Sequence, residues 1–126
     1  MLSDKDVMAT IAVKDIKVAS HFYEDTLGLK RFATEGPGAV VYKSGMTTLF
    51  VYESGYAGTN RATAATWVVG EGFDGVVQTL QQKGATFEHY DNLPGTTRQG
   101  DVHVAGKVKL AWLKDPDGNI LALASG

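Results

Sequence analysis

One pattern constrains the fold of this chain most: a strand, a helix, a glycine, a short strand and a hairpin occur in that order twice. The stretch TLGLKRF closes the first predicted helix at Gly28, and QKGATFE closes the second at Gly84. Glycine often follows the last helical turn because it adopts the left-handed conformation at no steric cost. Because the repeated unit covers nearly half of the chain, recognising it decides which fold we predict for the whole sequence. We therefore predict two βαβββ modules, spanning about 7–53 and 64–124, within one domain of residues 1–126.

The first module starts with an apolar segment, VMATIAV, which predicts a strand over 7–13. Asp15 then suits the N-cap of a helix over 16–27, because its carboxylate can accept hydrogen bonds from the first backbone amides. Apolar residues recur at helical spacing in this segment, as expected for a helix with one buried face. Three predicted strands follow, at 30–33, 38–43 and 46–52.

The second module repeats this order after a polar loop at 54–63. We predict a strand, a helix, a short strand, a long loop and two final strands. Because long loops often carry binding residues, we expect the loop to form an adjustable wall of a cavity. The ranges, in chain order, are 64–70, 72–83, 85–89, 90–106, 107–113 and 119–124.

The composition excludes several partners and chemistries. A net charge of −2 and a pI near 5.8 leave no basic surface of the kind that binds nucleic acid. No apolar run approaches the roughly 20 residues of a membrane span. The chain has no cysteine, which excludes disulfides and thiolate metal sites. The first residues, MLSDKDVMAT, do not resemble a signal peptide. We expect a cytoplasmic protein with no nucleic-acid or membrane partner.

The stretch DPDGN near the end of the chain allows two interpretations, a calcium loop and a turn. A helix–loop–helix calcium site needs glycine at its sixth position and glutamate at its twelfth. Counted from Asp115, those positions hold Ile120 and Gly126, which excludes this kind of site. Proline in second place and Gly118 in fourth place are typical of a type I turn. We therefore predict a hairpin turn between the last two strands.

Two motifs together resemble the vicinal oxygen chelate superfamily, which includes glyoxalase I, bleomycin-resistance proteins, fosfomycin-modifying enzymes and extradiol dioxygenases. The first is IAVKDIKVASHFYEDTLGLK at 11–30, and the second is DPDGN followed by ILAL at the end of the second module. The resemblance implies an α+β fold in which two βαβββ modules form a concave half-barrel around a ligand cavity. The helices would pack outside. It also implies a homodimer.

Metal-dependent members of this superfamily place His, Glu or Gln ligands on the first and last strands of each module. Carried over to this chain, those places fall on Met8, Phe50, Ala65 (with Thr66 adjacent) and Ala122. None of these side chains holds a hard divalent cation. We therefore predict no metal, no cofactor and no catalytic residue. An unusual site remains as an alternative, formed by His89 and His103 with Glu53, Glu71 or Glu88.

Side chains that point into the predicted cavity follow from the alternation along each strand. Aromatic and hydroxyl-bearing residues dominate this set, which is typical of a pocket for a flat or amphipathic organic molecule. Trp112 lies beside the final turn and could face either way. The predicted ligand-binding residues are Met8, Thr10, Thr48, Phe50, Tyr52, Trp67, His103 and Trp112.

Three functions are compatible with these features. The first, which we favour, is a non-catalytic protein that binds or sequesters a small aromatic or amphipathic molecule such as an antibiotic. The second is a metal-dependent lyase, isomerase or dioxygenase of the same superfamily. The third is a non-catalytic interaction subunit whose cavity is filled by its own side chains.

Overall fold

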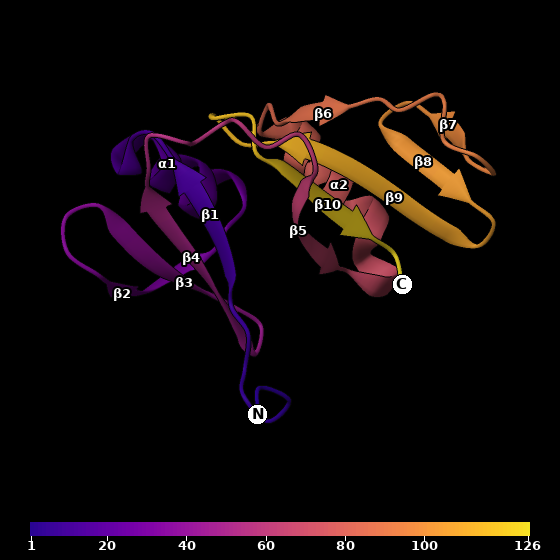
Figure 1. The fold of residues 1–126 in the computed structure, drawn as a ribbon. Helices are drawn as coiled ribbons and strands as arrows, with labels where there is room; N and C mark the ends of the chain where they lie inside the picture. Colours follow the sequence, from indigo (N-terminus) through magenta and orange to yellow (C-terminus); the bar gives the residue numbers. More distant parts are fainter. The chain divides into compact units, whose positions relative to one another are not determined.

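The computed structural model describes residues 1–126 and contains two compact units, Met1–Ala57 and Gly58–Gly126. Each unit contains one of the two predicted modules (Figure 1). We call the units module 1 and module 2 and describe each by itself. No helix in either module is long and apolar enough to cross a membrane.

Module 1 consists of a four-stranded sheet and one helical segment. The chain passes through β1 (Ala9–Val13), α1 (Ile16–His21) and the π-helical segment η1 (Phe22–Thr26). The strand order is β1-β4-β3-β2, with β1 parallel to β4 and the other pairs antiparallel. The predicted βαβββ order is confirmed here. Its last three strands are β2 (Lys30–Thr34), β3 (Ala39–Ser44) and β4 (Thr47–Glu53).

Local signals set the ends of the helical segment. Asp15 Oδ1 accepts hydrogen bonds from the backbone amides of Lys17 at 2.9 Å and Val18 at 3.5 Å. This contact confirms the predicted N-cap. Gly28 adopts a φ of +74°, the left-handed conformation expected at the end of a helix. The predicted helix over 16–27 is confirmed in position, although its second half is π-helical.

One face of the module 1 sheet carries the core. The hydroxyl of Tyr42 in β3 donates a hydrogen bond to Glu24 of η1 at 2.8 Å, so Tyr42 lies on the face that the helical segment covers. We call this the helix face of module 1 and the opposite one its open face. The core residues that share the helix face by register are at most 2% exposed: Ile11, Val13, Val40, Leu49 and Val51.

Module 2 has a larger sheet. After β5 (Thr63–Val68) the chain forms the 3₁₀ turn η2 (Gly70–Gly72) and α2 (Phe73–Gln82). The strand order is β5-β10-β9-β8-β7, β6 also pairs with β9, and β5 runs parallel to β10. The remaining strands are β6 (Thr86–Glu88), β7 (Thr97–Gln99), β8 (Val102–Ala105), β9 (Val108–Lys114) and β10 (Ile120–Ala124).

The predicted loop over 90–106 is wrong in its second half, where β7 and β8 form an antiparallel hairpin. Gly100 and Gly106, on either side of β8, both have positive φ, as turns at the ends of a strand require. The sequence DVHVAG contained this signal, because Val102 and Val104 alternate around His103 between these glycines. His103 therefore lies in a strand and not in a loop.

The helix α2 covers one face of the module 2 sheet. Lys109 Nζ in β9 donates to both carboxylate oxygens of Asp74 in α2, at 3.0 and 3.1 Å. Ala111 and Leu113 alternate with Lys109, so they share this helix face, and both are fully buried. The opposite side of the sheet is the open face of module 2. Two residues of β10 complete the buried helix face by register: Leu121 and Leu123.

The DPDGN stretch forms the predicted hairpin turn between β9 and β10. The Gly118 amide donates to the Asp115 carbonyl at 3.0 Å, and Gly118 has a φ of +86°. The Asp115 carboxylate accepts from the amide of Asp117 at 2.9 Å, and from the amide and the side chain of Asn119 at 2.8 Å each. Both oxygens of this carboxylate thus stabilise the turn itself.

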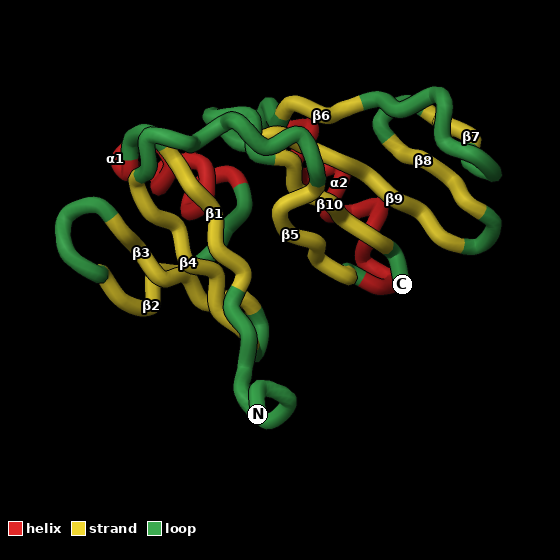
Figure 2. Tube along the Cα trace, viewed as in Figure 1, coloured by secondary structure: helices red, strands yellow, loops and turns green.

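The predicted α+β fold class is confirmed. Figure 2 shows the helices in red and the strands in yellow, with one helical segment and one sheet in each module. The two sheets are hydrogen-bonded separately, and neither forms a closed barrel.

Candidate functional site

The open face of module 1 carries a pair of stacked aromatic rings. Phe50 and Tyr52 of β4 lie on it, with their ring centroids 5.7 Å apart and their planes 14° from parallel. The register places Thr10 opposite Phe50, and Thr48 precedes Phe50 by two residues on the same face. These side chains are exposed or half-buried, whereas the neighbouring Leu49 is buried. The predicted common orientation of these four residues is confirmed, and their contact with a ligand stays a prediction.

The same face continues into an exposed cation–aromatic pair. Phe32 of β2 lies at a register shift between its neighbours Arg31 and Ala33, and it is 65% exposed. Lys43 Nζ of β3 lies 5.3 Å from the centroid of the Phe32 ring. Such a cation is attracted by the negative face of the ring. Met8, the remaining predicted residue of module 1, precedes β1 and is 41% exposed.

The open face of module 2 has a cluster of three rings. Trp112 alternates with Ala111 and Leu113, which places it on the open face and settles an orientation that the sequence left undecided. His103 packs edge-to-face against Trp112 at 4.8 Å, and Tyr90 lies 5.1 Å from Trp112 and 5.9 Å from His103 between ring centroids. Three rings from β8, β9 and the segment after β6 thus form one aromatic surface.

His103 is a neutral, buried member of this cluster. Its Nε2 accepts a hydrogen bond from the Tyr90 amide at 2.9 Å, which assigns the ring proton to Nδ1. The side chain is fully buried, and Nδ1 has no hydrogen-bond partner. Burial lowers the pKa of His103, and the backbone of Leu110 opposes this effect more weakly. The imidazole therefore anchors the start of the segment that leads to β7.

The charged groups near this cluster are paired. Lys114 Nζ lies 3.2 Å from the Glu88 carboxylate. Arg98 donates to Asp91 at 2.6 Å, and this contact lowers the pKa of Asp91 and raises that of Arg98. His89 contacts the Asp101 carboxylate at 2.7 Å, which lowers the pKa of Asp101. The open face of module 2 therefore carries balanced charges.

The orientation predicted for Trp67 is wrong. In the parallel pairing of β5 with β10, Trp67 lies beside Leu123, which belongs to the helix face, whereas Thr66 lies beside Ala122 on the open face. Ala65 lies beside Leu121 and so shares the helix face with Trp67, which means that the face expected for this strand was wrong by one residue. The role of Trp67 in ligand binding stays a prediction.

The metal site of the superfamily does not fit the residues present. On the open face of module 1, the corresponding place is filled by the ring of Phe50. In module 2, the methyl group of Ala122 is almost fully buried between Trp112 and Thr66. No three His, Cys, Asp or Glu side chains group as a metal ion requires. The alternative site with His89 and His103 does not form either. His103 accepts a hydrogen bond from the Tyr90 amide, and His89 contacts Asp101.

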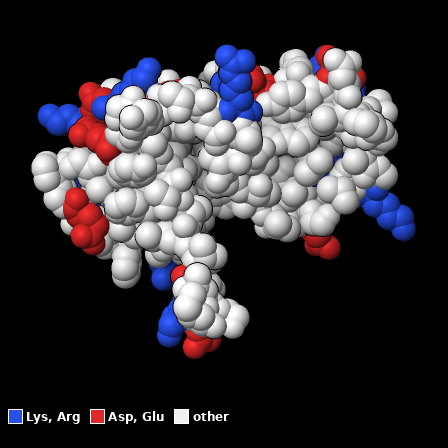
Figure 3. All heavy atoms as spheres, viewed as in Figure 1, with Lys and Arg blue, Asp and Glu red and all other residues white.

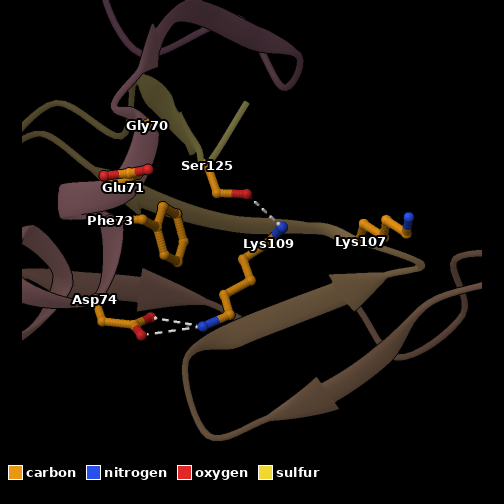
Figure 4. A pocket seen from close by; sticks show the side chains of 7 residues that line it. All are labelled: Gly70, Glu71, Phe73, Asp74, Lys107, Lys109 and Ser125. Atoms are coloured by element: carbon orange, nitrogen blue, oxygen red, sulfur yellow. Dashed lines mark hydrogen bonds and ion pairs between the residues drawn. The ribbon is translucent and has the colours of Figure 1, made fainter.

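A hollow of about 270 Å³ lies elsewhere in module 2, near the start of α2 (Figure 4). The paired side chains of Lys109 and Asp74 line it, and the backbone amide of Lys109 donates a hydrogen bond to Ser125 Oγ at 2.9 Å. None of the predicted ligand-binding residues lines this hollow. Its lining is Gly70, Glu71, Phe73, Asp74, Lys107, Lys109 and Ser125.

Charged side chains form separate small groups among uncharged atoms on the face of the molecule seen in Figure 3. The face in view shows no continuous basic area of the kind that follows a nucleic-acid backbone.

The comparisons with known proteins agree with this geometry. The family model of the Glyoxalase/Bleomycin resistance protein/Dioxygenase superfamily matches residues 7–123. A solved glyoxalase/bleomycin resistance protein/dioxygenase from Alicyclobacillus acidocaldarius is similar at 21% identity, with a TM-score of 0.70 over 98% of this chain and 93% of that one. Lactoylglutathione lyase from Agrobacterium tumefaciens is similar at 14% identity, with a TM-score of 0.70 over 98% and 95%.

The fosfomycin resistance protein FosX from Mesorhizobium loti is similar at 12% identity, with a TM-score of 0.69 over 100% of this chain and 94% of that one. No curated protein matches the chain. Since the family model covers nearly all of the sequence, the chain belongs to the glyoxalase/bleomycin resistance/dioxygenase superfamily. The structural likenesses, at these low identities, show its fold.

Proposed function

We propose that the protein binds a small aromatic or amphipathic molecule, such as an antibiotic, and sequesters it without a chemical step. The stacked pair of Phe50 and Tyr52 on the open face of module 1 carries this proposal. Aromatic rings on an uncovered sheet face offer stacking area to a planar ligand. The half-buried rings of Tyr90 and Trp112 offer a second such surface, with the buried ring of His103 packed against both. We further propose that the protein acts as a homodimer in the cytoplasm.

The absence of hard metal ligands at the four family positions supports binding over chemistry. Metal-dependent relatives would need carboxylate, amide or imidazole groups there. This chain has Met8, Phe50 and Ala122, and in β5 it has Thr66 on the open face, with Ala65 beside it on the helix face. Without side chains that coordinate a cation, these positions provide no metal ion to which the oxygens of a substrate could bind. The proposed role therefore uses the aromatic character of the open faces and needs no metal ion.

A ligand screen with two matched variants tests the proposal. Thermal shifts are measured with a panel of planar aromatic and amphipathic compounds, because a ligand that binds only the folded protein raises its melting temperature. Phe50→Ala removes half of the stacked pair, and Tyr56→Ala removes an aromatic side chain that is 83% exposed outside the strands. We expect the shift to be lost with Phe50→Ala and kept with Tyr56→Ala.

Recovery of the ligand separates binding from catalysis. After prolonged incubation with protein and added Zn²⁺, Ni²⁺ or Mn²⁺, we expect mass spectrometry to return the compound unchanged. Stoichiometric metal in the purified protein, together with turnover of the compound, would contradict the binding function and support a metal-dependent enzyme. A panel that produces no shift at all would favour the interaction subunit.

A further inference from the structure

We propose that the open face of module 1 selects planar aromatic ligands that carry a negative charge, with the ring on Phe50 and Tyr52 and the anionic group at Lys43. This inference depends on the proposed binding function and adds the charge class of the ligand to it. Three observations carry it: the sign of the charges on this face, the position of Lys43 relative to the stacked rings, and the contrast with module 2.

The strand residues of the open face include two charged side chains, and both are lysines. Lys30 and Lys43 are register partners in β2 and β3, both are exposed, and neither forms an ion pair. Glu24 and Glu53, in contrast, lie on the helix face, where Glu24 binds Arg31 and Glu53 accepts from the Ile16 amide. The other acids of module 1 lie outside its strands: Asp4, Asp6, Asp15, Asp25 and Glu35.

Lys43 is close to the stacked rings along the sheet. The register places it opposite Thr48, which precedes Phe50 by two residues on the same face. Two residues along a strand span roughly 7 Å. The ammonium group of Lys43 lies over Phe32 of β2, on the other side of β3 from Phe50. We expect the flexible lysine side chain to turn toward β4 and meet the carboxylate of a fused two-ring system stacked on Phe50. The ring of Phe32, beside Lys43, adds apolar surface at this end.

Module 2 has no comparable excess of positive charge. On its open face, Lys114 pairs with Glu88 at 3.2 Å and Arg98 pairs with Asp91 at 2.6 Å. A carboxylate ligand there would have to compete with an existing partner of each cation. Among the strand residues of the two open faces, the cations without an ion pair are therefore those of module 1, and the charge preference should be located there.

Three probes with the same ring system isolate the charge: 2-naphthoate, neutral 2-naphthamide and cationic 2-naphthylmethylammonium. Dissociation constants are measured at low salt by ¹H–¹⁵N NMR titration of the full chain, which also shows which amides shift. We expect 2-naphthoate to bind about threefold more tightly than the amide, since an exposed ion pair changes affinity by roughly 1.4- to 5-fold. The cation should bind most weakly, and the amides of β4 should shift.

Variants with matched controls assign the preference to the lysines. Lys43→Met should reduce the advantage of 2-naphthoate over the amide, and the double variant with Lys30→Met should abolish it. Lys43→Arg should keep it. Lys17→Met removes the same charge from the exposed surface of α1 and should leave the preference unchanged. Added salt should weaken the preference, because it screens exposed charges.

The outcomes distinguish the charge inference from the proposed function. Equal affinities for 2-naphthoate and 2-naphthamide, or a preference that survives in the double variant, would overturn the charge inference and leave ring binding in place. Shifts confined to the amides around Trp112 would overturn the assignment to module 1. No binding of any of the three probes would overturn the proposed function itself.

Discussion

Protonation of His103 should destabilise the protein as the pH falls below neutrality. The imidazole is fully buried and its Nε2 accepts the Tyr90 amide at 2.9 Å. A protonated ring has no lone pair for this bond, so its N–H group would face the amide N–H. Burial lowers the pKa of His103 in the folded state, with Arg98 and His89 acting in the same direction and Asp91 in the opposite one.

The sign of the effect follows from proton linkage. Because the folded pKa lies below the unfolded one, the unfolded chain binds the proton first, and stability falls as the pH falls through about 6.5. The loss continues until the pH reaches the folded pKa of His103. At pH 5.5 it is at most about 1.4 kcal/mol, the free energy of protonating an unperturbed histidine one unit below its pKa.

Urea unfolding at pH 7.5 and pH 5.5, followed by the fluorescence of Trp67 and Trp112, measures this difference. His103→Gln keeps an oxygen that can accept from the Tyr90 amide but does not titrate, so its stability should change much less between the two pH values. His21→Gln is the matched control, because the side chain of His21 is 81% exposed on α1. An equal pH dependence in wild type and His103→Gln would refute the reasoning.

Two further predictions concern the turn and the loop that packs on it. Asp115→Ala should lower the free energy of unfolding by about 2–4 kcal/mol, because the buried carboxylate accepts three hydrogen bonds from Asp117 and Asn119; a loss below 1 kcal/mol in urea unfolding would contradict this role. Gly58→Ala should destabilise more than Gly36→Ala in the same assay. Both glycines have positive φ, but a Cβ at Gly58 would lie 2.6 Å from the Asp117 carbonyl oxygen, whereas one at Gly36 meets open space. Equal losses would show that this close approach relaxes freely.

Most of the architecture could be predicted because its signals are local. The cap at Asp15, the glycines that end both helices and the Asp115–Gly118 turn are each determined by residues close in sequence. The repeat of these signals was sufficient for the α+β fold and for the βαβββ order of module 1, whereas module 2 has the additional hairpin of β7 and β8. The orientation of Thr10 and Phe50 also followed, because β1 and β4 pair without interruption.

The errors concern features that depend on strand pairing. The short strands β7 and β8 carry weak local signals and are held by their pairing with each other and with β9. The orientation of Trp67 depends on its pairing beside Leu123 of β10, which alternation within β5 cannot reveal. The charge of the open face of module 1 was equally hidden, because it depends on where Glu24 and Glu53 find their partners.

The alternation along β4 has a consequence for how this scaffold changes over evolution. Leu49 and Val51 support the core, while Thr48, Phe50 and Tyr52 face away from it. Replacing the second group leaves most of the folding free energy untouched, so new ligand preferences can arise by single substitutions without a compensating change elsewhere. Alternate residues of one strand thus divide between the core and the proposed recognition surface, so substitutions on that surface should change the ligand preference while the chain remains folded.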